Sequence, residues 1–101
     1  MTKHTVFHHW KVKTGREDEF ERAWAEVTRD GKERCGSHGA VLSRCDDGTY
    51  AAYAVWPDKE SREKCWLGPE SQTEEAKTLL DCTEEKLAEV LMDEKNDMLG
   101  G

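Results

Sequence analysis

The segment Tyr50–Trp56 constrains the fold of this chain more than any other segment does. Its sequence, YAAYAVW, predicts a strand that is apolar on both alternating faces, with Tyr50 and Trp56 on one face and Tyr53 on the other. Such a strand needs a covering layer on each side, because an exposed apolar face would remain adhesive. Helices of the same chain can supply one layer. We expect a second copy of the protein to supply the other.

Length and charge limit the number of domains and the kinds of partner. A chain of 101 residues can bury one core, so we expect a single domain over residues 1–101. Lys and Arg number 15 and Asp and Glu number 22, which gives a net charge of −7, and acidic or apolar residues interrupt every basic stretch. Nucleic acid and anionic membrane surfaces bind clustered basic residues, so neither is an expected partner.

The apolar runs and the cysteine spacing indicate the cellular compartment of the protein and the redox state of its cysteines. No run approaches the roughly 20 apolar residues that cross a bilayer, and the N-terminus has no apolar signal core, so we expect a cytoplasmic protein. The four cysteines, Cys35, Cys45, Cys65 and Cys82, match neither a CxxC pair nor a dense disulfide framework. The sequence therefore predicts reduced thiols, with a redox or metal role as the alternative.

The first half of the chain predicts a strand, a helix and a second strand. Thr5–Lys13 alternates as a strand, and Thr14–Glu17 forms a capping box that predicts a helix ending near Gly31. A second strand is expected over Ala40–Cys45. The turn Asp46-Asp47-Gly48 that follows suits a tight hairpin, because Asp-Gly pairs accept positive φ angles.

The second half predicts two helices and leaves the last element open. Pro57 ends the Tyr50–Trp56 strand, and Asp58 can cap a short helix over Lys59–Leu67. Ser71–Glu74 is a second capping box. Leu87–Leu99 either continues the helix after that box or forms a fourth strand. We prefer the strand, because it completes a ferredoxin-like βαββαβ order, an α+β fold with a four-stranded antiparallel sheet and helices on one face.

Several short motifs together resemble the antibiotic biosynthesis monooxygenase family. They are the segment WKVKTGREDEF from Trp10 to Phe20, the loop from Gly36 to Gly39, the Asp-Asp-Gly hairpin, and YAVWP from Tyr53 followed by a helix containing Glu63 and Trp66. The resemblance covers nearly the whole chain. It implies a homodimeric α+β barrel, in which two ferredoxin-like sheets pack face to face.

The resemblance also implies a range of functions. Similar proteins include oxygenases that oxidise electron-rich aromatic molecules without metal or flavin, haem-degrading monooxygenases, and proteins with no assigned activity. The haem-degrading members use an Asn, a Trp and a His where this chain has His8, Trp66 and Ala76. Alanine cannot ligate iron, which argues against haem degradation. The leading hypothesis is a cofactor-independent monooxygenase acting on a small aromatic or quinone-like substrate. The alternative is a non-catalytic or stress-related dimeric barrel that holds a small ligand.

His8 and Trp66 are the candidate catalytic residues. His8 lies on the apolar face of its strand, where burial favours a neutral imidazole that can take a proton from a phenol or an enol. Trp10, Trp24 and Tyr53 are the candidate substrate-binding residues, since aromatic side chains stack on aromatic ligands. The structural alternatives are a His bonded to the backbone and aromatic side chains that fill the core or, for Tyr53, a subunit contact.

The three N-terminal histidines do not predict a metal site. His8 and His9 are adjacent in a strand and point to opposite faces, and His4 is expected in a fraying end.

Overall fold

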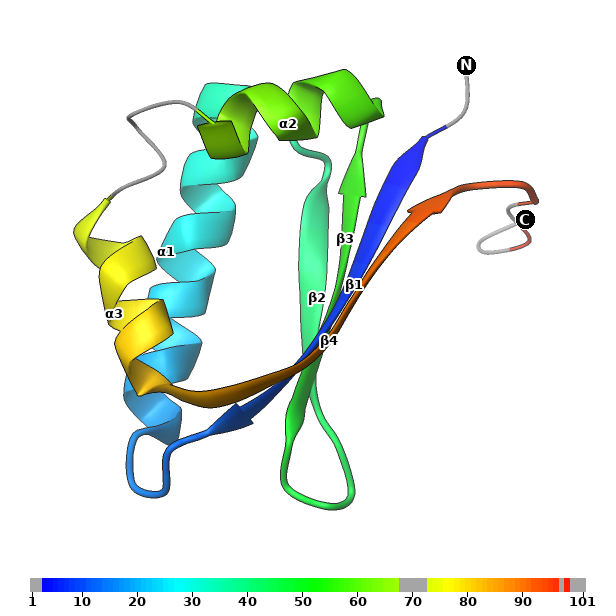
Figure 1. Ribbon diagram of the computed structural model, residues 1–101. Helices are drawn as coiled ribbons and strands as arrows, with labels where there is room; N and C mark the ends of the chain where they lie inside the picture. Colours follow the sequence, from blue (N-terminus) through cyan, green and yellow to red (C-terminus); the bar gives the residue numbers. More distant parts are fainter. Residues whose placement is uncertain (1–2, 68–72, 97, 99–101) are drawn as a thin grey trace.

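The computed structural model describes residues 3–67, 73–96 and 98, without the side chains of residues 66 and 67 (Figure 1). The elements follow in the order β1 (His4–Val12), α1 (Glu17–Cys35), β2 (Gly39–Arg44), β3 (Tyr50–Trp56), α2 (Lys59–Leu67), α3 (Glu74–Cys82) and β4 (Thr83–Asp93). The strands pair antiparallel in the order β2-β3-β1-β4, and the helices cover one face of the sheet (Figure 1). This confirms the ferredoxin-like α+β fold, with a strand as the last element.

The pairing register places residues in rows that run across all four strands. One row faces the helices and consists of Leu42, Ala52, His8 and Glu89. The next row faces away from the helices and consists of Val41, Tyr53, Phe7 and Val90. Successive residues of a strand point to opposite faces, so neighbouring rows belong to two different surfaces. The outward row is apolar throughout, as the sequence of β3 predicts for that strand.

The core lies between the sheet and the helices α1 and α3. Phe20 of α1 is fully buried, and its ring centroid lies 5.4 Å from that of Trp10 and 5.3 Å from that of Tyr50. Tilted and edge-on ring contacts of this kind stabilise aromatic clusters beyond the area that they bury. The hydroxyl of Tyr50 donates a hydrogen bond to Glu21 at 2.7 Å, which satisfies the polar end of a buried ring.

Helix α1 differs from the prediction at both ends. Thr14 does not cap it, since Arg16 occupies the N-cap position and Glu17 accepts a hydrogen bond from the backbone N–H of Gly15 at 2.8 Å. At the other end the helix continues past Gly31 and ends at Gly36, whose φ of 76° allows a left-handed cap. Gly31 is buried instead, and a Cβ there would lie 3.8 Å from the ring of Trp56. That distance is an ordinary van der Waals contact, so the packing would accept an alanine at this position.

The cap of α3 also differs from the predicted box. The hydroxyl of Thr73 accepts from the backbone N–H of Ala76 at 3.1 Å, while Ser71 lies outside the described residues. The cap of α2 agrees with the prediction, because Asp58 accepts from the N–H of Ser61 at 2.7 Å.

The β2–β3 hairpin forms where the sequence predicts it, with a different turn. Gly48 alone among residues 46–48 has a positive φ, 90°, so the expectation for the Asp-Gly pair is wrong at Asp47. The N–H of Gly48 donates to the carbonyl of Cys45 at 2.9 Å, and Asp47 accepts from the N–H of Thr49 at 2.9 Å. This is a three-residue loop with glycine at the left-handed position.

The prediction that all four cysteines are reduced is wrong. Cys35 and Cys65 form a disulfide with a Cα–Cα distance of 5.6 Å, whereas Cys45 and Cys82 are free thiols. The bond joins the end of α1 to α2. Sequence spacing gave no sign of it, because the two cysteines are 30 residues apart and only the packing of the two helices brings them together.

No helix in the described ranges is long and apolar enough to span a membrane.

Candidate functional site

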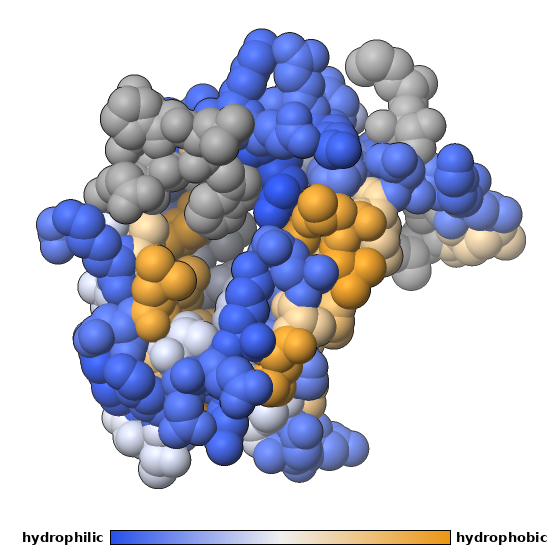
Figure 2. All heavy atoms as spheres, in the orientation of Figure 1, coloured by the Kyte–Doolittle hydropathy of each residue, from blue (hydrophilic) through white to orange (hydrophobic). Residues whose placement is uncertain are grey.

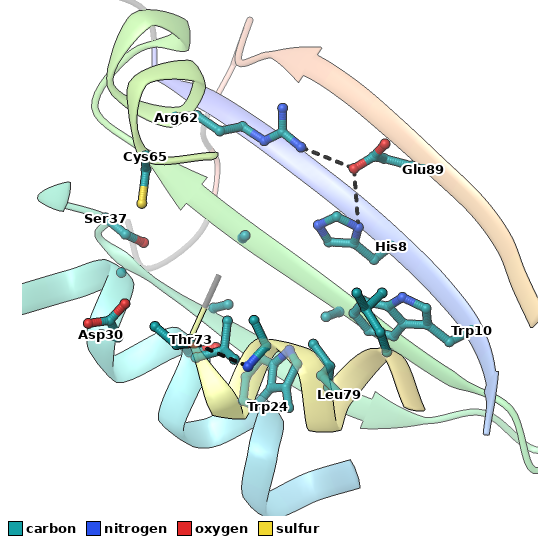
Figure 3. A pocket seen from close by; sticks show the side chains of 18 of the residues that line it. His8, Trp10, Trp24, Asp30, Ser37, Arg62, Cys65, Thr73, Leu79 and Glu89 are labelled. Carbon is teal, nitrogen blue, oxygen red and sulfur yellow. Dashed lines mark hydrogen bonds and ion pairs between the residues drawn. The ribbon is translucent and has the colours of Figure 1, made fainter. Parts of the chain in front are cut away.

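A cavity of about 510 Å³ lies between the sheet and the helices. On the sheet side, three of the residues of β2 and β3 that line the cavity have small side chains, which leaves space above the sheet. They are Ala40, Ala52 and Ala54. Three tryptophans line it, Trp10, Trp24 and Trp56. Figure 3 shows the first two of these. Figure 2 shows hydrophobic side chains over α3 and along β4 with charged side chains between them. The space has the size and the aromatic lining of a small-ligand site.

His8 of β1 stands at one side of this cavity (Figure 3). Its imidazole stacks on the indole of Trp10, with ring centroids 5.1 Å apart and planes 10° from parallel. Nδ1 is buried and lies 3.6 Å from Oε1 of Glu89, the residue opposite His8 on β4. In Figure 3 the other ring nitrogen points toward the cavity. The ring is thus held between an aromatic neighbour and a carboxylate.

Burial determines the protonation state of His8. It lowers the pKa of the imidazole to about 4, against the opposing effect of the Glu89 carboxylate, and the positive charges of Lys86 and Arg62 lower it further. His8 is therefore neutral at neutral pH. A neutral imidazole carries a proton on one nitrogen and a lone pair on the other, so it can act as a proton acceptor.

Glu89 connects three elements around His8. It accepts a hydrogen bond from Nη2 of Arg62 on α2 at 3.0 Å and pairs with Nζ of Lys86 at 3.2 Å. Burial tends to raise the pKa of Glu89. The hydrogen bond and charge of Lys86, the charge of Arg62 and the charge that His8 carries when it is protonated outweigh this effect and hold the pKa below its usual value. Glu89 is therefore an anion at neutral pH. All four side chains line the cavity.

Solved structures with the same fold match nearly the whole chain. A provisionally assigned antibiotic biosynthesis monooxygenase from Bordetella bronchiseptica has a TM-score of 0.77 and 22% identity, over 97% of this chain and 100% of that one. SnoaB, a cofactor-independent oxygenase from Streptomyces nogalater, has a TM-score of 0.83 and 20% identity, over 98% of this chain and 99% of SnoaB. This chain has the antibiotic biosynthesis monooxygenase fold. No family model matches its sequence, and no match to a curated protein was found.

The antibiotic biosynthesis monooxygenase fold brings together three of the five predicted site residues. His8, Trp10 and Trp24 line the cavity. Tyr53 does not, because β3 turns it to the opposite face of the sheet, where it is 41% exposed. Trp66 lies in α2, and its side chain is outside the described part of the structure.

Sequence reasoning missed Glu89, Arg62 and Lys86, and it did not include Trp56 among the site residues although this residue lines the cavity. A carboxylate between Leu87 and Leu91 was a usable signal, because it interrupts an alternating apolar pattern. Its partner on β1 became identifiable only once the register was known.

The other N-terminal histidines lie apart from His8. His9 is on the outer face, where Nε2 lies 2.8 Å from Oγ1 of Thr49. His4 is buried within β1, 3.4 Å from Oδ1 of Asp93, and the expectation of a fraying end is wrong. Within the described residues no group of three or more His, Cys, Asp or Glu side chains could hold a metal ion.

Proposed function

We propose that this protein is a cofactor-independent monooxygenase that oxidises a small phenolic or hydroquinone-like molecule in the cavity. The observation that carries the proposal is a neutral imidazole, His8, facing a space walled by three indole rings. Aromatic walls suit an aromatic substrate, and a proton acceptor suits one with an acidic hydroxyl group. The shared fold with SnoaB, itself described as a cofactor-independent oxygenase, supports the same reaction class.

The proposed reaction starts with proton transfer from the substrate hydroxyl to His8. The anion gives one electron to dioxygen, and the substrate radical and superoxide then join at a ring carbon as a peroxide. The O–O bond breaks as the ring carbon loses its hydrogen and the outer oxygen leaves as water. The substrate gains one oxygen atom, loses two hydrogens and supplies all the electrons. The apolar walls of the cavity limit the access of water to the reactive intermediates.

The weak basicity of His8 narrows the substrate class. A phenol with a pKa of about 10 lies six units above an imidazole with a pKa of about 4, so proton transfer costs roughly 8 kcal/mol. That is about half of the ~16 kcal/mol barrier that corresponds to a turnover near 10 per second. Substrates with a more acidic hydroxyl group, such as enols conjugated to a carbonyl, lower this cost. We therefore favour acidic phenols and enols over simple phenols.

Oxygen uptake with a dihydroxynaphthalene whose hydroxyl group is made more acidic by a conjugated carbonyl substituent tests the proposal. The wild-type protein should consume oxygen and incorporate one atom of labelled dioxygen into a hydroxynaphthoquinone, and His8→Phe should lose the activity. His38→Phe is the matched control, because His38 is exposed and does not line the cavity. Equal activity in wild type and His8→Phe would overturn the role of His8.

The low pKa of His8 also favours one alternative, a non-catalytic protein that holds an aromatic ligand in the same cavity. Quenching of tryptophan fluorescence by the naphthalene with no oxygen uptake would identify this function, since Trp10, Trp24 and Trp56 surround the ligand.

We also propose that the protein is a homodimer. In the outward row, Val41 is 64%, Tyr53 41% and Val90 45% exposed. Monomeric proteins rarely leave a contiguous apolar surface exposed in this way. A second copy of the sheet would cover this row, as the resemblance to the antibiotic biosynthesis monooxygenase family implies.

A further inference from the structure

We infer that Glu89 is a positioning residue that holds the proton of His8 on Nδ1, so that the lone pair of Nε2 faces the cavity. This inference rests on the proposed role of His8 as a proton acceptor. Neither the fold nor the reaction class requires it, because it follows from the side chains of this chain.

The backbone enforces the contact between the two residues. His8 and Glu89 are direct partners in the β1–β4 ladder, and both side chains point to the helical face. Facing residues in such a ladder have Cβ atoms about 5 Å apart. The 3.6 Å approach of Nδ1 to Oε1 is therefore a consequence of register rather than of a mobile surface pair.

Electrostatics select the tautomer. Nδ1 is buried, and the carboxylate of Glu89 is the anion that faces it. A proton on Nδ1 points toward that negative charge, whereas a lone pair on Nδ1 would repel it. A small shortening of the distance gives a charge-assisted hydrogen bond, which is stronger than a neutral one. The proton thus stays on Nδ1 and leaves Nε2 free to accept the substrate proton.

The neighbours of Glu89 keep it ionised and in place. Arg62 reaches it from α2 and Lys86 from its own strand, at 3.0 and 3.2 Å. The remaining charged groups of the cavity are engaged elsewhere: Arg34 pairs with Asp30 on α1 at 2.6 Å, and Lys77 of α3 lies 3.6 Å from Glu74. Glu89 is consequently the carboxylate that stabilises the imidazolium formed when His8 takes a proton.

Nitrogen NMR of histidine-labelled protein tests the inference without a substrate. In the wild type at neutral pH, His8 should show a protonated Nδ1 and an unprotonated Nε2. Glu89→Gln should lower the pKa of His8, because it removes the one group that raises it, and should introduce the second tautomer. Glu85→Gln is the control, since Glu85 is exposed on the same strand and does not line the cavity.

Two results would overturn the inference. One is a wild-type His8 with its proton on Nε2, a measurement that needs no variant to fold. The other is a folded Glu89→Gln protein with an unchanged His8 pKa and tautomer.

Oxygen uptake separates this inference from the proposed function. A proton on Nδ1 together with no uptake from any acidic phenol would keep the role of Glu89 and reject the monooxygenase. Where uptake occurs, Glu89→Gln should lower kcat more than it raises KM and shift the acidic limb of the pH profile.

Discussion

The Sγ atoms of Cys35 and Cys65 join the last residue of α1 to the helix that carries Arg62. Cys65 lines the cavity, and Arg62 bonds to Glu89 beside His8. The disulfide therefore fixes α2 at the position where it contributes to the site. Disulfides persist in oxidising compartments and are uncommon in the cytoplasm. In a cytoplasmic protein, which is the location expected from the sequence, the Cys35–Cys65 bond would be transient. A small-molecule disulfide would oxidise the two thiols, and a dithiol would reduce the bond again.

Reduction of this bond should destabilise the protein. Closing a loop with a sequence separation of 30 removes unfolded-state entropy worth about 3 to 4 kcal/mol. Urea unfolding of Cys35→Ser should show a loss of this size relative to wild type. Dithiothreitol should have the same effect on wild type and little on the variant. Cys45→Ser is the control, because Cys45 is a free thiol. Equal stability of the oxidised and reduced wild type would contradict the prediction.

Stability should also depend on pH through His8. Its pKa is about 4 in the folded protein and 6.5 in the unfolded chain, so the unfolded state binds more protons between these values. The free energy of unfolding should therefore rise with pH from about 4 to 6.5, by at most roughly 3 kcal/mol from this group. The pKa of Glu89 is lowered from 4.5, so its contribution is present above that pH and is lost as the pH falls below it, at the acidic end of the His8 range.

Chemical denaturation at a series of pH values measures this dependence. His8→Asn should flatten the rise, whereas His38→Asn should leave it in place because His38 is exposed. A slope that survives in His8→Asn would assign the effect to another group.

Filling the cavity should abolish ligand binding while keeping the fold. Ala54 lies on the cavity floor, and Ala54→Leu would occupy part of the space between the indole rings. We expect the affinity for a naphthol to fall at least tenfold, measured by tryptophan fluorescence. The matched control is Ala25→Leu on α1, outside the cavity lining. Unchanged affinity in a folded Ala54→Leu protein would place the ligand elsewhere.

A charge on the outward row should prevent association. Tyr53→Lys introduces a cation at the centre of the row, between Val41 and Phe7, and burial of an unpaired charge is costly. Sedimentation at micromolar concentration should give a dimer for the wild type and a monomer of 11.6 kDa for the variant. Leu80→Lys, at a more exposed site on α3, should remain dimeric. A monomeric wild type would reject the homodimer.

The sequence predicted elements well wherever the signal was local. Alternation and Pro57 define the strand Tyr50–Trp56 to the residue, and the Asp58 cap defines Lys59–Leu67. Gly31 misled the prediction because a glycine can also lie inside a helix that tertiary packing stabilises, and the sequence does not distinguish such a glycine from a helix stop.

The site was predictable only in part, because half of it depends on pairing between distant segments. Periodicity alone placed His8 under the helices. Its contact with Glu89 depends on a register that shifts twice along the β1–β4 pair, after His9 and after Lys11. Such irregularities follow from tertiary packing and leave no local pattern. The disulfide was missed for the same reason.

The alternation of β1 has a consequence for how such a protein can diverge. Phe7 and His8 are neighbours in sequence, yet one belongs to the outer surface and the other to the cavity. Substitutions can therefore alter the chemistry of one surface and leave the other unchanged. A single-residue insertion or deletion within β1 would instead exchange the two surfaces along the strand. Evolution of new substrates on this scaffold should proceed by replacement in the central strands, with length changes confined to the loops.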